Sequence, residues 1–385
     1  MNATLDEMIG ALSEAALHPW QTVIKTMKET GKDAIGCFPI HTPEEIAYAA
    51  DCVPIGMWGG RTRIRLADKY LQSFCCSIMR SNIEFAMNGV YDMLKAVIIP
   101  TFCDTLKCVS ENWKTAIPHI PVITAVYPQN RNAAALSYLR EEFLRIRGEI
   151  ERILSIAISD DKLEEAFSVY EDCRNALRSF AKAASARPDA IDNRARHLIL
   201  KAGYFMDKKP YTRLIRELTD ELASVPERRF DGFRAVMTGL IGEPVEMADA
   251  FAENRIAIVA DDIAHASRQF RTAARTEGDA IDRMVHRIAD QKGDTFLYED
   301  GKSKGEMLLD MVSEHGADAV VVCMMKFCDP EEFDYPIVKE ALEKAGVPLL
   351  HIETDQQPDS YEQIRTRVQS FAEMLEARAV AGRRK

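Results

Sequence analysis

Short, unbroken apolar runs separated by helical patterns constrain the fold of this chain most. In the first third they occur at residues 34–37, 53–57, 96–100 and 121–126, and each is bounded by a turn or a loop. Strands that are buried on both faces of a parallel sheet have this continuous apolar pattern. With helical segments between them, the runs predict an α/β domain over about residues 31–130.

The same signals return in the last third of the chain. They predict a second α/β domain over residues 232–378, so the expected fold is α/β with two Rossmann-like parallel-sheet domains. Between the domains, apolar residues step by three and four and predict a helical segment at 131–231, and residues 1–30 form a helical segment by the same pattern. The four strand signals of the second domain lie at residues 234–238, 256–260, 319–323 and 347–352.

Length and charge exclude several classes of protein. A chain of 385 residues is too long for one hydrophobic core. Its formal charge of −11 would repel a nucleic-acid backbone, and no stretch interleaves basic and aromatic residues, so nucleic acid is not an expected partner. Neither a signal peptide nor an apolar run long enough to span a membrane is present, and we expect the protein in the cytoplasm.

Nine cysteines are unlikely to form disulfides in a reducing compartment, which makes metal binding the leading hypothesis for some of them. Cys103 and Cys328 each follow a predicted strand, one in each domain. Cofactors of open α/β sheets bind at the carboxyl ends of strands, so these two thiols are expected to face one another across a cleft. The adjacent pair Cys75 and Cys76 offers a third thiolate. Three soft thiolates suit an iron–sulfur cluster.

Spacing alone leaves two readings of the cysteines open. They match no common zinc or ferredoxin spacing, and cysteine is among the residues that are most often simply buried. Cys173 is in phase with the apolar face of its helix and is expected to pack, and Cys323 lies within a predicted strand. Packing is also the favoured reading for the remaining three, Cys37, Cys52 and Cys108.

Other motifs are weaker. The run from Gly301 to Ser303 resembles the end of a phosphate-binding loop, but Phe296 stands where the first glycine is needed, so the chain is not expected to hydrolyse ATP itself. Thr42 is predicted to cap a helix that begins with a proline. The pair Asp261 and Asp262 is predicted to cap a helix, with a polar strand-end site as the alternative. Three histidines are read as packing or surface residues: His41, His119 and His351.

Eight segments together resemble the 2-hydroxyacyl-CoA dehydratase family. The resemblance covers about residues 31–375 and is closest to the smaller, β-type subunit, chiefly because of the nine residues at 324–332. The segments are AIGCFP at 34–39, PEEI at 43–46, FCCSIM at 74–79, CDTL at 103–106, YPQNR at 127–131, ADD at 260–262, SRQ at 267–269 and MMKFCDPEE at 324–332.

The resemblance implies a cofactor and its ligands. The cysteines of the family that hold a [4Fe-4S] cluster fall on Cys76, Cys103 and Cys328, so the cluster is expected in the cleft between the domains. Cys75 leaves an ambiguity, because its place in the family is usually not cysteine and an adjacent thiol could substitute for Cys76. No general base is identified on this chain.

The implied reaction is the loss of water from an (R)-2-hydroxyacyl-CoA to give a 2-enoyl-CoA, by a radical mechanism of anaerobic amino-acid fermentation. The resemblance implies a heterodimer in which an α subunit binds most of the substrate and an ATP-dependent iron–sulfur activator delivers the electron. This chain would relay that electron. Two alternatives remain: a subunit of a benzoyl-CoA-reductase-like enzyme, and a non-catalytic iron–sulfur scaffold of the same fold.

Overall fold

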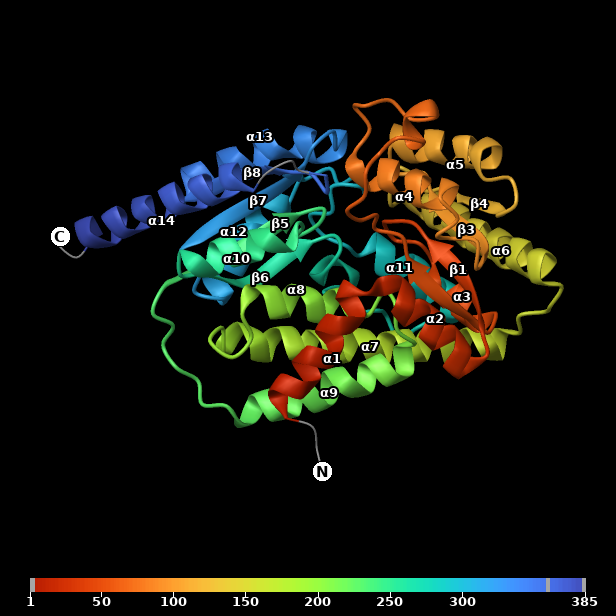
Figure 1. Cartoon of the computed structure of the whole chain (residues 1–385), viewed down its shortest axis with the longest axis horizontal. Helices are drawn as coiled ribbons and strands as arrows, with labels where there is room; N and C mark the ends of the chain where they lie inside the picture. The colour runs from red at the N-terminus through yellow and green to blue at the C-terminus, as the bar shows by residue number, and fades with distance from the viewer. Residues whose placement is uncertain (1–3, 358–360, 383–385) are drawn as a thin grey trace.

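The structure is a computed structural model that describes residues 4–357 and 361–382. It contains two four-stranded sheets in which every pair of neighbouring strands is parallel, as the apolar runs predict. Helices flank both sheets, and the predicted pair of Rossmann-like domains is confirmed (Figure 1).

The first sheet has the strand order β2-β1-β3-β4. The order reverses direction between β1 and β3, which is where an open α/β sheet forms a crevice at the carboxyl ends of its strands. The elements of this part of the chain are β1 (Asp33–Cys37), α3 (Glu44–Ala49), β2 (Cys52–Gly56), η1 (Ala67–Lys69), α4 (Ser77–Met87), β3 (Leu94–Pro100), α5 (Asp104–Ala116), β4 (Val122–Ala125) and α6 (Ala133–Leu154).

The second sheet repeats this arrangement, with the order β6-β5-β7-β8. Strand β7 therefore takes the place that β3 has in the first sheet, next to the point of reversal. The elements here are β5 (Phe233–Gly239), α10 (Val245–Glu253), β6 (Ile256–Ile263), η2 (Ser267–Gln269), α11 (Ala280–Ala289), α12 (Lys304–Glu314), β7 (Ala319–Met325), α13 (Asp329–Lys344), β8 (Leu349–Thr354) and α14 (Glu362–Gly382).

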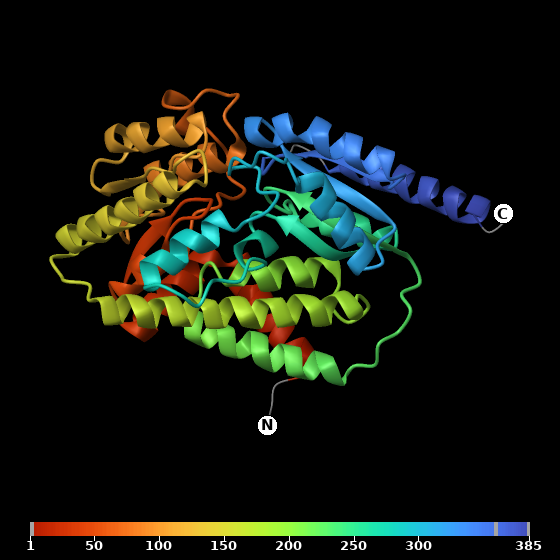
Figure 2. The same ribbon diagram turned by 180° about the vertical axis from the view of Figure 1, so that it is seen from behind.

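Helices of the two helical segments, residues 1–30 and 131–231, form a layer beneath the two sheets, as Figure 2 shows from behind. Sequence periodicity does not predict where the separate helices in the second half of the 131–231 segment begin and end. Helix α7 enters two cores: its first half packs with the first sheet, and its second half, from Cys173 onward, packs with α1, α8 and α9. The helices are α1 (Leu5–Leu17), α2 (Pro19–Thr30), α7 (Asp160–Ala186), α8 (Asn193–Ala202) and α9 (Lys208–Ser224).

Two capping predictions are wrong. Pro43, not Thr42, is the N-cap residue of α3, and the Thr42 hydroxyl donates instead to the carbonyl of Phe38. Asp261 and Asp262 lie inside β6 rather than after it, and neither is the N-cap residue of a helix. Their carboxylates bind side chains and backbone from other elements, because β6 continues three residues beyond its apolar run.

None of the helices in the described ranges combines the length and the apolar character that crossing a membrane requires.

Candidate cofactor site between the two domains

Each of the three predicted ligands is the N-cap residue of a helix. Cys76 precedes α4, Cys103 precedes α5 and Cys328 precedes α13. Cys103 and Cys328 reach this position because they follow β3 and β7, the strands at equivalent places in the two sheets. Figure 1 shows α13 and the α4–α5 layer on either side of the boundary between the sheets.

A helix N-terminus suits a thiolate, because the free N–H groups and the positive end of the helix dipole face it. The Sγ atom of Cys103 already accepts a hydrogen bond from the backbone N–H of Leu106 at 3.5 Å. The first turn of α13 contains Pro330, which has no backbone N–H and therefore leaves no donor without a partner at that position. Three separate helix starts thus present sulfur atoms at the ends of the sheets.

Burial and neighbouring charged groups both affect the charge state of the three thiols. Burial, with smaller contributions from Cys103 and Cys75, raises the pKa of Cys76 to about 12. Burial also raises the pKa of Cys328 well above its usual range, with additional contributions from Glu331, Cys76 and Cys103. Two thiols of the first domain, Cys76 and Cys103, thus affect the pKa of Cys328 in the second domain. As free groups the thiols are therefore neutral, and binding a metal would displace their protons.

The same apolar cluster contains Cys76, Cys328 and Met325, and Cys103 packs against it. Ser77, the residue after Cys76, connects the two domains directly: its hydroxyl lies 3.4 Å from the sulfur of Met325 at the end of β7. The carboxyl end of β7 is therefore in contact with the start of α4.

Across residues 4–357 and 361–382, no group of three or more histidine, cysteine, aspartate or glutamate side chains is arranged around a single metal ion. A cubane cluster makes a different demand, since each cysteine binds its own iron and the thiols stand further apart than the ligands of one ion. Three thiols, from two domains and all at helix N-termini, meet that demand in donor type and leave one iron of a cubane for another ligand. We conclude that the residues fit an iron–sulfur cluster.

The other cysteines occupy different surroundings. Cys173 is buried in the helical core, as its phase predicts, and Cys323 is buried inside β7 with its sulfur 3.8 Å from that of Met247. Cys37 and Cys52 are buried, whereas Cys108 is exposed and does not pack as expected. Cys75 is buried beside Cys76.

Aromatic side chains next to two of the cysteines face solvent. Phe74 is 65% exposed and Phe327 is 47% exposed, although large apolar side chains are normally buried. Phe327 also adopts a φ of 63°, in the left-handed region that non-glycine residues rarely use. The chain thus accepts both exposed apolar surface and backbone strain beside the cysteines.

Gln356, just beyond β8, is a residue of this site that the sequence analysis missed. Its backbone N–H donates to the hydroxyl of Ser77 at 3.0 Å, and its side-chain amide donates to the carbonyl of Trp58 and to the carboxylate of Glu243. Its side-chain oxygen accepts from the backbone N–H of Gly60. The side chain is buried and spans the domains, and no local sequence signal marks it.

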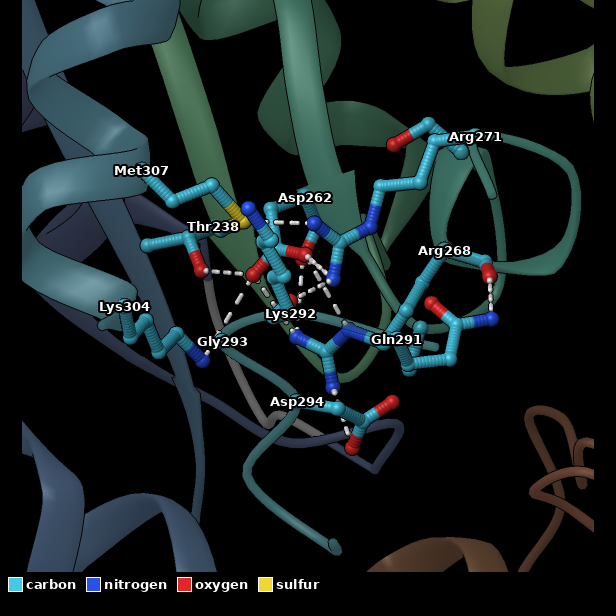
Figure 3. Close-up of polar contacts among 12 residues, drawn as sticks. Thr238, Asp262, Arg268, Arg271, Gln291, Lys292, Gly293, Asp294, Lys304 and Met307 are labelled. Carbon is cyan, nitrogen blue, oxygen red and sulfur yellow. Dashed lines mark hydrogen bonds and ion pairs between the residues drawn. The ribbon is translucent and has the colours of Figure 1, made fainter. Parts of the chain in front are cut away.

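A buried ionic network behind the site was also missed. Asp262 accepts hydrogen bonds from Thr238 and Arg268, and forms ion pairs with Arg271 at 3.1 Å and Lys304 at 3.6 Å (Figure 3). Asp262 is fully buried, and its burial raises its pKa, but the three cations outweigh this and hold the pKa below its usual range. The carboxylate is therefore ionised and compensated.

The network reaches the first domain through Asp294. One oxygen of Asp294 lies 3.9 Å from Arg268, and the other is 2.8 Å from the Nε2 atom of His41. His41 is thus a buried, hydrogen-bonded residue rather than a surface one, whereas His119 is exposed and pairs with Asp92. The remaining histidine of the prediction, His351, stacks on Tyr335.

The fold defines a class: α/β proteins with two Rossmann-like parallel-sheet domains. The model of the family described as 2-hydroxyglutaryl-CoA dehydratase, D-component, matches residues 39–375. This chain belongs to that family.

Three relatives with named functions agree with this assignment. The chain is 41% identical to the lactoyl-CoA dehydratase subunit beta of Anaerotignum propionicum, over 96% of this chain and 99% of that one. It is 38% identical to the (R)-phenyllactyl-CoA dehydratase beta subunit of Clostridium sporogenes, with the same coverage. It is also 38% identical to the (R)-2-hydroxyglutaryl-CoA dehydratase subunit beta of Acidaminococcus fermentans, over 92% of this chain and 96% of that one.

Proposed function

We propose that this chain is the β-type iron–sulfur subunit of an (R)-2-hydroxyacyl-CoA dehydratase, a lyase that removes water from its substrate to give a 2-enoyl-CoA. The observation that carries the proposal is the match, over nearly the whole chain, to three β subunits of dehydratases that act on different 2-hydroxyacyl-CoA thioesters. We infer for this protein the reaction class that the three relatives share, and not the acyl chain of any one of their substrates.

In this proposal Cys76, Cys103 and Cys328 hold a [4Fe-4S] cluster between the α/β domains at 31–130 and 232–378, with helical segments at 1–30 and 131–231. Their positions at three helix N-termini support the assignment. A cluster bound there would supply a low-potential electron for the reaction.

The residues of this chain prepare the site in two ways. Buried thiols in an apolar cluster keep water from the sulfur atoms, which lowers the local dielectric and raises the effect of nearby charges. The helix N-termini then offset the negative charge that three thiolates and a reduced centre would carry. Gln356 holds the start of α4 against the second domain, so that Cys76 keeps its position relative to Cys328.

The proposed partners are an α subunit, which binds most of the substrate, and an ATP-dependent iron–sulfur activator, both acting with this chain in the cytoplasm. The name beta subunit, which three relatives carry, supports the α partner. The exposed Phe74 and Phe327 support it independently, since apolar side chains beside a functional site are commonly covered by another protein.

The test is the electron balance of the reconstituted enzyme. Loss of water from a 2-hydroxyacyl-CoA is redox-neutral, so the electron is returned after each turnover and reductant is needed only in catalytic amounts. We expect activity from this chain only together with the α subunit, the activator, ATP with magnesium and a reductant, and we expect many enoyl-CoA molecules per electron consumed.

Three results would contradict the proposal. A ratio of product to electrons of one or less would indicate a reductase that consumes reductant at each turnover, as the benzoyl-CoA-reductase-like alternative requires. Turnover by this chain alone without ATP would exclude the division of labour between subunits. An iron-containing complex with no turnover on any 2-hydroxyacyl-CoA would indicate the non-catalytic scaffold.

A further inference from the structure

A second buried site lies away from the three cysteines. A cavity of about 70 Å³ lies where α3, α7, α8, α9 and α11 meet the segment around η2. This volume holds several water molecules or one small polyatomic ion. The cavity joins parts of the chain that are more than two hundred residues apart, and none of Cys76, Cys103 and Cys328 lines it.

Two of the three cations that line the cavity are compensated. Lys208 lies 3.4 Å from a carboxylate oxygen of Glu44 and donates a hydrogen bond to the carbonyl of Gly203 at 2.8 Å. Arg174 donates to Glu45 at 2.7 Å and to Glu171 at 2.9 Å. Each of these cations therefore has a close anionic partner.

Arg287 of α11, the third cation, lacks such a partner. Arg287 is only 5% exposed. The nearest carboxylate oxygen belongs to Glu45, lies 3.7 Å from the Nη2 atom of Arg287, and already accepts a hydrogen bond from Arg174. Among the described residues, its Nε and Nη1 atoms have no hydrogen-bond partner, and the same is true of Nη2 of Arg174. A buried donor without a hydrogen-bond partner destabilises the folded state, so native proteins rarely contain such donors.

The electrostatics of Arg287 agree with the geometry. Burial, followed by repulsion from Arg174, lowers its pKa to about 10, a direction that an adequate anionic partner would reverse. His265, which also lines the cavity, adds no positive charge, because burial lowers its pKa well below its usual range. Arg174 and Arg178 share Glu171, so four cations of this group, Arg174, Arg178, Lys208 and Arg287, face three carboxylates, Glu44, Glu45 and Glu171, which leaves one positive charge in excess.

We propose that this cavity binds one small monovalent anion, either a halide or a small carboxylate, through the free N–H groups of Arg287 and Arg174. The anion lies among helices that belong to different cores, so it ties α11 to α7 and α3. Its binding therefore stabilises the fold and acts independently of the cysteine site.

The first test is crystallographic and needs no variant. Crystals of the complete αβ complex are soaked in sodium bromide, and the anomalous signal of bromine is measured. We expect a peak in the cavity within hydrogen-bonding distance of Arg287, and its loss when formate competes would show that carboxylates share the site. Density for water alone, or bromide only on the surface, would overturn the proposal.

The second test measures stability in solution at constant ionic strength. Replacing sodium gluconate, whose anion is too large for the cavity, by sodium chloride or formate should raise the Tm of the complex by about 2–4 °C. The Arg287→Leu variant should lose this rise, Arg287→Lys should keep part of it, and the exposed control Arg213→Leu should keep all of it. An equal rise in Arg287→Leu would contradict the assignment.

Discussion

The backbone N–H of Gln356, just beyond β8 of the second domain, donates a 3.0 Å hydrogen bond to the hydroxyl of Ser77, the first residue of the helix that Cys76 caps. The position of Cys76 is thereby tied to the same sheet edge that places Cys328. This contact and the side-chain bonds of Gln356 act together with the Ser77–Met325 contact to fix the relative position of two proposed ligands in different domains.

Replacing Gln356 should loosen the cluster before it affects the rest of the fold. Gln356→Ala leaves a carboxylate oxygen of Glu243 and the carbonyl of Trp58 without this donor, at a cost of about 1–3 kcal/mol. We expect the variant to lose iron to a chelator faster than the wild-type protein under anaerobic conditions. The visible absorption of the cluster measures this loss. Gln369→Ala on the exposed face of α14 is the matched control, and equal rates in the two variants would show that Gln356 does not position the site.

Serine substitutions test the ligand set. Anaerobically purified protein should be brown and contain about four irons and four sulfides per chain. Cys76→Ser, Cys103→Ser and Cys328→Ser should each lose iron, because serine is a poorer ligand for iron–sulfur centres, whereas Cys173→Ser should retain it. Full iron in the Cys103 or Cys328 variant would refute the set. Loss in Cys75→Ser with retention in Cys76→Ser would move that ligand by one residue.

Arg268 should be essential to the stability of the buried network. Arg268→Met removes the cation between Asp262 and Asp294, both fully buried, and leaves their charges poorly compensated. We expect a loss of about 3–5 kcal/mol in the free energy of unfolding by urea. The control Arg275→Met breaks a partly exposed pair with Asp290 and should cost at most about 1 kcal/mol. Similar losses in both variants would show that burial of the network adds nothing.

The same network predicts sensitivity to acid. Burial raises the pKa of Asp294, but His41 and Arg268 outweigh it and hold the pKa well below its usual range. A carboxyl group whose folded pKa is depressed stabilises the protein above its unfolded pKa of about 3.9, and this stability is lost as the pH falls below that value. Asp294→Asn should therefore flatten the decline in unfolding free energy below about pH 4. Asp160→Asn, at an exposed site, should leave the decline unchanged; a wild-type slope in Asp294→Asn would contradict the role of this group.

Much of the fold follows from local sequence patterns. The apolar runs predict each of the eight strands in the described residues, because strands that are buried on both faces of a parallel sheet are mostly apolar. The position of Cys103 and Cys328 just after such runs predicts that they lie at strand ends. Cys76 needed the resemblance, since nothing in its own neighbourhood separates it from Cys75.

The tertiary structure alone decided the contacts that join distant segments. Gln356 meets Ser77 across 279 residues, and His41 meets Asp294 across 253, and neither pair has a periodic or spaced signal. Asp262 has the sequence neighbours of a helix cap, yet its partners come from three other elements and make it the centre of an ionic network. Arg287 lies on a helix whose pattern says only that its face is buried, and the surplus charge there depends on which carboxylates the other helices bring near it. Hydrophobic periodicity specifies which side of an element is buried, whereas the pairing of buried charges depends on how the elements pack together.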